Sequence, residues 1–427
     1  MKGLEGLKVV ELTSYVAGPA CPRILAEMGA TVYKIEPFEG DDYRNNASGF
    51  GMSKTEIDDP AFDLTSTNKT FVSINLKTEG GAEFLDKLLK EADVLVTSFR
   101  DGGLKRLGLD YETASKKYPS LVWAQMRGYG WRGPEKDSRG FDNTAYNGRG
   151  GVFASLPQSD NFAPVNMPNG FGDFQCALAL TAGITSALYR REKTGKGDKV
   201  TVNLYHVACW AQQIGLASTQ FGDKWPKSRK RATTPTNNTY MAGDGTWFVM
   251  CMGSSYTYFP LIMQLLELDE LLEDEKFGSL EIMNSTGANV EAIRRMEEAF
   301  AKHDFAYWQK VFDENSIAYH RLYHFEDILV DEEAYDNDIL RKLPYDAFGE
   351  KALTTSPIRL ESVGDPIIYR SRPIGYDTKS VMEEYGYSDE EIEALVQGEA
   401  VKVYDGPELK GCVLEPSYGP DKGSDTS

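Results

Sequence analysis

The sequence predicts an α/β protein built on a parallel sheet. Its first 200 residues alternate short apolar strands with helices, and helices that connect successive strands are what a parallel sheet requires. A hydrophobic content of 41% and a charged content of 26% are typical of a globular chain. No apolar run is long enough to span a membrane.

The expected elements follow in a regular order. The apolar run at 8–12 predicts the first strand, and Gly18-Pro19-Ala20 predicts the start of the first helix. The alternating run at 71–76 predicts a further strand, and the amphipathic run at 81–92 predicts a further helix. Strands are expected at 8–12, 31–35, 71–76, 94–99, 121–126 and 199–203, and helices at 18–28 and 81–92. Residues 43–66 have no clear period and are expected to form a loop or a short irregular insertion. Ligands of such sheets bind outside the carboxyl ends of the strands.

The second half of the chain predicts a smaller α+β domain. A strand is expected at 246–252 and helices at 256–266, 290–302 and 305–315, after a basic linker at 224–231. Ser388 and Glu391 predict a capping box for a late helix. The expected domain plan is a first part of a large domain at 1–200, a linker at 201–235, a small domain at 236–328, a return to the large domain at 329–418 and a disordered tail at 419–427.

Composition excludes several classes of function. The formal net charge of −19 argues against nucleic acid and anionic membranes as partners, because both need a basic face. The five cysteines are far apart and form no Cys-x-x-Cys pair, and the four histidines lack a zinc-helix arrangement, so we expect no metal site. The first residues lack the layout of a signal peptide, so we expect a cytoplasmic protein. Cations scattered through the first third can still hold one anionic small molecule.

Asp173 is the most informative residue. It lies in a glycine-flanked turn, Asn169-Gly170-Phe171-Gly172-Asp173, directly before a long apolar run. Glycines allow a ligand to approach the backbone closely, and a helix N-terminus stabilises negative charge. Two interpretations stay open at this point, a nucleophilic carboxylate and a simple helix N-cap.

A second glycine pattern matches a dinucleotide-binding motif but lacks the context that such a site needs. The run from Gly128 to Gly133 matches Gly-x-Gly-x-x-Gly and follows a strand. A polar loop follows it where a dinucleotide site needs a helix, so we do not expect NAD binding.

Many short segments form a recognisable series along the chain: Val16-Ala17-Gly18-Pro19, Val32-Tyr33-Lys34-Ile35-Glu36, Asn68-Lys69, Asn75-Leu76-Lys77, Ser98-Phe99-Arg100, Arg106-Leu107-Gly108, Gly128-Tyr129-Gly130, Gly140-Phe141-Asp142, Gly172-Asp173, Thr194-Gly195-Lys196-Gly197 and Gly386-Tyr387-Ser388. Together they resemble the family III CoA-transferases, most closely the enzymes of anaerobic bacteria that act on 2-hydroxy acids, such as phenyllactate and 2-hydroxyisocaproate CoA-transferases. The order and spacing of the segments hold over nearly the whole chain.

The resemblance implies a fold, a partner and a set of site residues. It implies a Rossmann-like large domain made of both chain ends, a smaller inserted α+β domain and an interlocked homodimer. Asp173 falls on the family's nucleophilic aspartate, Gly172 near its oxyanion donors, and Gly253 and Ser254 near its lid. Coenzyme A contacts are implied for Val16, Ala17, Leu76, Lys77, Ser98, Phe99, Arg106 and Arg139. Two departures from formyl-CoA transferase are Val16, where that enzyme has glutamine, and Pro37-Phe38, where it has arginine.

The implied reaction moves CoA from an acyl-CoA or enoyl-CoA to a carboxylic acid through mixed anhydrides and an aspartyl-CoA thioester. Acyl-CoA is then a substrate, and no cofactor is held permanently. An α-methylacyl-CoA racemase is the first alternative, although Phe141 stands where the racemases have histidine. A non-catalytic acyl-CoA binding protein is the second. The aromatic residues and methionine that can line an acyl pocket, or can belong to the core, are Tyr15, Tyr43, Phe50, Met52, Tyr146 and Tyr240.

Overall fold

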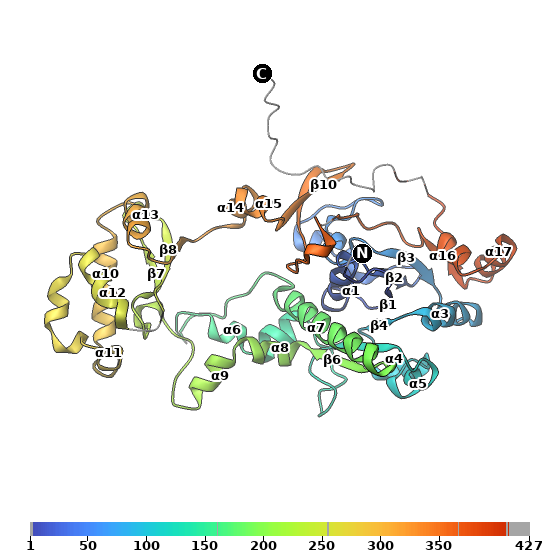
Figure 1. Cartoon of the computed structure of the whole chain (residues 1–427), viewed down its shortest axis with the longest axis horizontal. Coiled ribbons are helices and arrows are strands. Elements are labelled where there is room, and N and C mark those ends of the chain that lie inside the picture. Colours follow the sequence, from blue (N-terminus) through green and yellow to red (C-terminus); the bar gives the residue numbers. More distant parts are fainter. Residues whose placement is uncertain (1–2, 160, 254–255, 366, 407–408, 410–427) are drawn as a thin grey trace, which may run out of the picture. The chain divides into compact units, whose positions relative to one another are not determined.

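The computed structural model describes residues 3–159, 161–253, 256–365, 367–406 and 409. The chain divides into two compact units (Figure 1). The large unit comprises Met1–Val152, Met167–Gln213 and Asp331–Ser427, and the small unit comprises Phe153–Asn166 and Ile214–Val330.

A seven-stranded sheet forms the centre of the large unit. Its order is β12-β3-β2-β1-β4-β5-β6, and every neighbouring pair is parallel except β12 with β3. The strands are β1 Lys8–Leu12, β2 Thr31–Glu36, β3 Thr70–Ile74, β4 Val94–Thr97, β5 Val122–Arg127, β6 Lys199–Asn203 and β12 Val401–Lys402. The strand order reverses between β1 and β4, which is where a doubly wound sheet opens a crevice for a ligand. The expected α/β class with a large parallel sheet is confirmed.

Alternating side chains of the strands build two apolar layers. On one face, Val9, Val32 and Val94 pack with residues of α1 and α7. On the other face, Val10 and Leu95 pack with residues of α3, α5 and α16. Consecutive residues point to opposite faces of a strand, so a sheet covered on both faces reads as a continuous apolar run.

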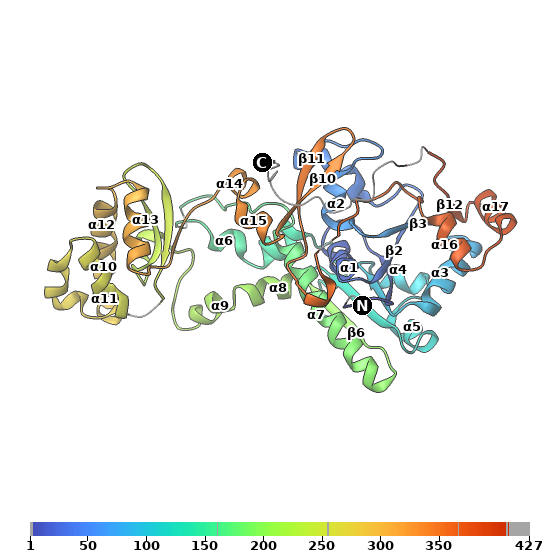
Figure 2. The ribbon, with the colours of Figure 1, turned by 45° about the horizontal axis from the view of Figure 1, so that its top comes forward.

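Helices cover both faces of this sheet. The helices of the large unit are α1 Ala17–Glu27, α2 Pro60–Ser66, α3 Glu79–Glu91, α4 Asp101–Arg106, α5 Tyr111–Lys117, α7 Phe171–Thr194, α8 Leu204–Ala211, α15 Glu332–Asp336, α16 Thr378–Glu384 and α17 Asp389–Gln397, with short turns η1 Asp42–Asn45, η2 Ala47–Phe50, η3 Asp142–Arg149 and η8 Glu361–Val363. The long helix α7 lies along α1 and β6 (Figure 1). A hairpin of β10 Leu340–Tyr345 and β11 Gly349–Thr354 lies beside α2 (Figure 2), and the hydroxyl of Tyr345 donates to Asp63 at 2.6 Å.

The small unit has a core of its own. Its antiparallel sheet consists of β7 Asn237–Met241, β8 Trp247–Cys251 and β9 Tyr319–Arg321. Its helices are α10 Phe259–Leu265, α11 Leu280–Thr286, α12 Ala288–Phe300, α13 Phe305–Glu314 and α14 Phe325–Leu329, with short turns η4 Arg229–Arg231, η5 Tyr256–Tyr258, η6 Asp269–Glu273 and η7 Glu275–Phe277. Two further helices, α6 Val152–Ser155 and α9 Gln213–Thr219, cross the boundaries between the units. Phe248 and Phe300 meet edge to face at 5.1 Å in the centre of this core.

Local structure departs from the sequence expectations in several places. Residues 43–66 contain the helix α2, which Asp59 caps by accepting from the N–H of Phe62 at 3.1 Å. The connection after β6 is largely helical, because α8 and α9 follow at once, and the strand β7 was not expected. The Ser388 capping box is confirmed, since Glu391 accepts from the N–H of Ser388 at 2.8 Å and returns its own N–H to the hydroxyl.

No helix within the described ranges is long and apolar enough to cross a membrane. In the same ranges, no group of three or more His, Cys, Asp or Glu side chains is arranged to hold a metal ion. The expected disordered tail at 419–427 and Cys412 lie outside the described residues.

Candidate active site

A cavity of about 890 Å³ lies at the carboxyl ends of the central strands of the large unit. Its walls come from segments that follow β1, β4, β5 and β6, together with the loop before η3 and the start of α7. The cavity therefore occupies the point at which the strand order reverses, where a doubly wound sheet binds its ligands.

The loop between β5 and η3 is closed at its base by two glycines. A Cβ atom added to Gly128 would lie 2.7 Å from the Cα atom of Gly140, and one added to Gly140 would lie 2.6 Å from the Cα atom of Gly128. Arg127 fixes the position of this loop, because its guanidinium group donates to the carbonyl of Lys136 at 2.9 Å and pairs with Asp101 of α4 at 2.8 Å. The glycine pattern that resembles a dinucleotide motif thus shapes one wall of the cavity, and the next helical element, η3, begins only at Asp142.

Glycines also bring the N-terminus of α7 to the cavity. Gly170 is the N-cap residue and has a φ of 81°, a left-handed conformation that glycine adopts without strain. Gly172 lies against the ring of Tyr146, so close that a Cβ atom would stand 2.2 Å from the ring carbon Cγ. The hydroxyl of Tyr146 donates to Gln175 at 2.7 Å and holds the ring in place.

Asp173 stands in the first turn of α7 and faces the cavity. It is the third residue of the helix, and Gly170 occupies the N-cap, so the interpretation of Asp173 as an N-cap is wrong. Its relative exposure is 9%, and no hydrogen bond or ion pair reaches its carboxyl group from any described residue. Burial, together with the charge of Asp142, raises the pKa of Asp173 to about 8. Asp173 is therefore mostly protonated in the empty cavity at pH 7.

A second carboxylate, Asp142, lies at the start of η3 and holds the same helix end. Its Oδ1 accepts from the N–H of Gly172 at 2.8 Å, and its Oδ2 accepts from the N–H of Gly170 at 3.1 Å. The amide of Asn147 also donates to Oδ2, at 3.0 Å. Asp142 therefore caps α7 from outside the helix.

Buried ion pairs support the opposite wall. Lys34 is fully buried and pairs with Glu11 at 3.0 Å and with Asp41 at 2.8 Å. Asp41 in turn accepts from the N–H groups of Tyr15 and Tyr43 at 3.1 and 3.0 Å. These contacts fix two of the segments that line the cavity.

Aromatic rings border the cavity. Tyr15 and Phe141 meet edge to face at 5.6 Å, and the Tyr43 and Phe50 rings lie 5.8 Å apart. Tyr43 is 3% exposed, and its pKa is raised by burial and by the nearby carboxylates Asp59, Asp173 and Asp41, so its hydroxyl stays neutral.

Most of the residues expected to contact CoA lie around this cavity. Val16, Ala17, Ser98, Phe99, Arg106 and Arg139 all line it, as do Arg100 and Lys136, which were not among the expected contacts. Leu76 and Lys77 follow β3 and do not line it, so their contact with CoA stays a prediction. In the part of the chain that the structure describes, Arg106 and Arg139 have no ion-pair partner.

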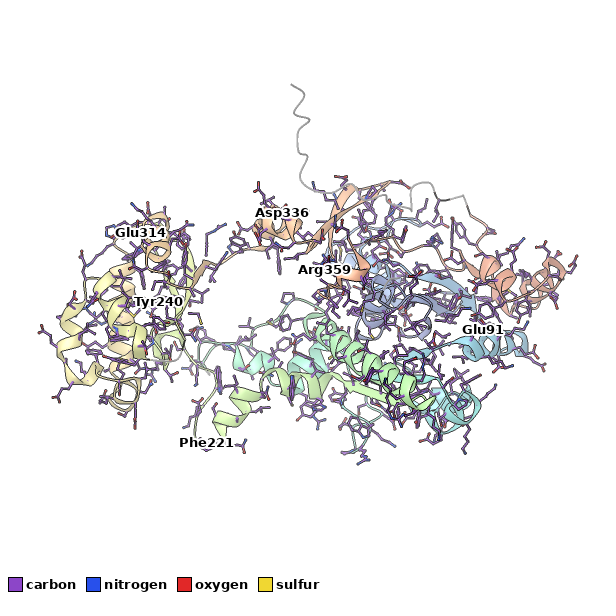
Figure 3. The ribbon with its side chains drawn as sticks, viewed as in Figure 1. Glu91, Phe221, Tyr240, Glu314, Asp336 and Arg359 are labelled. Carbon is purple, nitrogen blue, oxygen red and sulfur yellow. The ribbon has the colours of Figure 1, made fainter. Side chains whose placement is uncertain are left out.

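Some of the other expected site residues lie at the cavity and some do not. The N–H of Gly172 is already donated to Asp142, and Gly172 does not line the cavity. Gly253 is an exposed residue of the small unit with a φ of 71°, and Ser254 lies outside the described residues. Among the possible acyl-pocket residues, Tyr15, Tyr43 and Phe50 line the cavity, whereas Tyr146 is buried in the core of the large unit. Tyr240, labelled in Figure 3, belongs to the core of the small unit. Met52 is half-buried and does not line the cavity.

The sequence matches the model of "CoA-transferase family III" over residues 4–378. The chain belongs to CoA-transferase family III. The family resemblance of the sequence is therefore confirmed, and Asp173 and its cavity lie within the matched residues.

Two curated relatives in the family are similar over nearly their full lengths. The chain is 35% identical to (R)-2-hydroxy-4-methylpentanoate CoA-transferase of Clostridioides difficile over 399 residues, covering 93% of this chain and 99% of that one. It is 36% identical to cinnamoyl-CoA:phenyllactate CoA-transferase of Clostridium sporogenes over 402 residues, covering 93% and 97%.

Solved structures support the same fold. A CAIB/BAIF family protein from Brucella suis superposes with a TM-score of 0.71 at 25% identity, covering 90% of this chain and 99% of that one. A Mycobacterium tuberculosis protein superposes with a TM-score of 0.72 at 23% identity, covering 88% and 96%.

Proposed function

We propose that this member of CoA-transferase family III moves CoA from an acyl-CoA or enoyl-CoA to a carboxylic acid, with Asp173 as the nucleophile. The observation that carries the proposal is the position of Asp173, a buried and unpaired carboxyl group at the wall of a large cavity. A carboxylate held without partners is costly to the fold, and such groups concentrate at sites of chemistry.

Asp173 suits the role better than Asp142 does. Both carboxyl groups line the cavity, but the oxygens of Asp142 already accept N–H groups from Gly170, Gly172 and Asn147. Their lone pairs are engaged in holding α7. The oxygens of Asp173 have no such partner among the described residues and can attack a carbonyl carbon.

The proposed reaction has four steps that balance without a proton. An oxygen of ionised Asp173 attacks the thioester carbon of the donor, which forms a mixed anhydride and releases CoA thiolate. The thiolate attacks the carbonyl carbon of Asp173, which gives an aspartyl-CoA thioester and releases the donor acid. The acceptor carboxylate then attacks this thioester, releasing the thiolate, and the thiolate attacks the acceptor carbonyl to give the new acyl-CoA and free Asp173. Covalent catalysis thereby divides one exchange into easier steps.

Each tetrahedral intermediate needs a hydrogen-bond donor for its oxyanion. The N–H groups of Gly172 and Phe174 are already donated, to Asp142 at 2.8 Å and to the carbonyl of Gly170 at 3.1 Å. The neutral hydroxyl of Tyr43 lines the cavity and is the donor that the geometry of the large unit favours. Gly253 and Ser254 remain the proposed lid.

The cations of the cavity suit the phosphates of CoA. Arg100, Arg106 and Arg139 are exposed along the wall formed by α4 and the 128–140 loop. Guanidinium groups bind phosphate through paired N–H donors. Substituting Arg106 or Arg139 with methionine should raise KM for acyl-CoA, with the increase shrinking at high salt, and should leave kcat little changed.

We propose a 2-hydroxy acid with an apolar side chain as the acceptor. The aromatic wall of Tyr15, Phe50 and Phe141 fits an apolar group beside Asp173. The relatives named above act on 2-hydroxy-4-methylpentanoate and phenyllactate, which carry such side chains.

A CoA-exchange assay tests the function. Purified protein is incubated with acyl-CoA donors and a panel of 2-hydroxy acids, and each new thioester is identified by mass. We expect exchange with the wild-type chain and none with Asp173→Ala, which should still bind CoA. Substantial turnover by that variant would contradict the role of Asp173, and deuterium uptake at the α-carbon without exchange would favour a racemase. Binding without either reaction would favour the non-catalytic alternative.

We also propose that the chain forms a homodimer. Large apolar side chains are exposed on α8, on α9 and in the turn after α9: Trp210 is 67% exposed, Ile214 82% and Phe221 92%. Phe221 is labelled in Figure 3. Exposed apolar side chains such as Ile214 and Phe221 favour an interface between chains. Light scattering during size-exclusion chromatography should give twice the mass of 47.6 kDa, and Phe221→Asp should shift the protein toward that single-chain mass.

A further inference from the structure

The first turn of α7 is held by a carboxylate from a different element. Helix N-termini leave several N–H groups without partners, and a side chain at the N-cap normally accepts one of them. Gly170 has no side chain to do this. Asp142 of η3 takes its place and accepts from Gly170 and Gly172, which stand directly before Asp173.

The geometry of η3 fixes Asp142 in turn. η3 is a π-helix, in which the backbone bonds join residues five positions apart. Asn147 lies five positions after Asp142 and donates to its Oδ2 at 3.0 Å. Asn147 is fully buried, so this contact is not exchanged for one with bulk water.

We propose that Asp142 is a positioning residue that fixes the carboxyl group of Asp173 through the first turn of α7 and opposes the negative charge on that group until substrate enters. This inference rests on the proposed function. Asp142 need not touch the reacting atoms, because its oxygens act on the backbone of residues 170–172.

The two effects favour catalysis in different ways. The cap keeps the turn in one conformation, so the attacking oxygen is placed before substrate binds. Burial and the charge of Asp142 together keep Asp173 protonated in the empty cavity. When CoA binds, the cations of the cavity wall and the loss of water then change the pKa of Asp173, a carboxyl group that already titrates near neutral pH.

Other titratable groups near the pair stay neutral. Tyr43 of η1, Tyr146 of η3 and Cys176 of α7 all have raised pKa values through burial, that of Tyr146 reaching about 12. The cations at the cavity wall are Arg100, Arg106, Arg127, Lys136 and Arg139. Asp142 is thus the nearby anion whose removal should move the titration of Asp173.

The experiment compares pH profiles of kcat/KM for the wild type, Asp142→Asn and Asp142→Glu. Asp142→Asn removes the charge, so the rise of kcat/KM with pH that accompanies ionisation of Asp173 (the acid limb) should shift to lower pH by about one unit or more. The variant keeps one acceptor oxygen for α7 in place of two, so kcat at high pH should fall at least tenfold. Asp142→Glu keeps the charge, so its limb should stay near that of the wild type while kcat falls. Asp137→Asn, which removes another carboxylate lining the cavity, is the control and should leave the limb in place.

The outcomes separate this inference from the proposed function. If the acid limb of the kcat/KM profile of Asp142→Asn stays at the wild-type pH, or if both Asp142 variants keep the full wild-type kcat, the positioning role is overturned. If Asp142→Asn does not fold, full kcat in Asp142→Glu would still overturn it. A wild-type protein that performs no CoA exchange would instead overturn the proposed function, before any variant is compared.

Discussion

Replacing Asp173 by asparagine should stabilise the protein, and should do so more as the pH rises. The pKa of Asp173 is about 8 in the folded chain, against about 3.9 for an aspartate in an unfolded chain. Below pH 4 the group is protonated in both states and has no effect on the free energy of unfolding. As the pH rises toward 8, the unfolded state loses its proton first, so the wild-type protein becomes less stable.

The size of this effect follows from the two pKa values. At pH 7 the gap spans about 3 pH units, and each unit corresponds to about 1.36 kcal/mol, so the cost approaches 4 kcal/mol. At pH 5 the same reasoning gives about 1.5 kcal/mol. These values are upper limits, because an ionised carboxylate beside a cavity can draw in water. Asparagine has nearly the same shape and carries no charge, so Asp173→Asn removes the cost.

The assay is thermal unfolding of the wild type and Asp173→Asn at pH 5, 6, 7 and 8 and constant ionic strength. With about 2 °C per kcal/mol in a large domain, we expect the variant to melt higher and the gap to widen by several degrees across this range. Asp269→Asn, an exposed position in η6 of the small unit, should show no such trend. A gap that stays constant with pH, or a variant that is less stable at pH 8, would refute the reasoning.

Further predictions concern the supports of the cavity and the path of oxygen. Gly172→Ala places a Cβ atom 2.2 Å from the Tyr146 ring, so it should lower the free energy of unfolding by about 1–3 kcal/mol or more and sharply reduce kcat. The control is Gly49→Ala, which has open space around the new Cβ atom and should change neither quantity. Arg127→Met should raise KM for acyl-CoA and speed tryptic cleavage within the 128–140 loop, and unchanged cleavage would contradict the tie to Lys136. An acceptor acid labelled with ¹⁸O in its carboxylate should leave one labelled oxygen on Asp173 per turnover. Either oxygen of Asp173 can attack the next donor, so about half of the next donor acid released should carry the label. Donor acid that stays unlabelled would exclude the anhydride steps.

The sequence predicts the sheet well, because local patterns determine it. The apolar runs at Lys8–Leu12 and Lys199–Asn203 form strands with the expected bounds. The small helix α2 escaped prediction, since Asp59 and Pro60 are a cap and a helix start without an apolar period behind them.

The contacts that hold the site in place are harder to predict from the sequence, because they join residues that are far apart along the chain. Asp142 reaches N–H groups 28 and 30 positions away, and the two glycines of the β5 loop meet across twelve positions. Nothing in a single sequence marks such a pair, although Gly140-Phe141-Asp142 was recognisable as a family segment. The raised pKa of Asp173 likewise follows from tertiary burial beside Asp142, which no local sequence pattern indicates.

The measurement that bears most directly on the central claim is trapping of acyl transfer on Asp173. The protein is incubated with an acyl-CoA and then with hydroxylamine, and the peptide that contains residue 173 is analysed by tandem mass spectrometry. The account predicts a hydroxamate on the side chain of Asp173, formed only when acyl-CoA is present and absent from Asp173→Asn. A peptide that remains unmodified in protein that exchanges CoA, or a hydroxamate found on Asp142 instead, would contradict it.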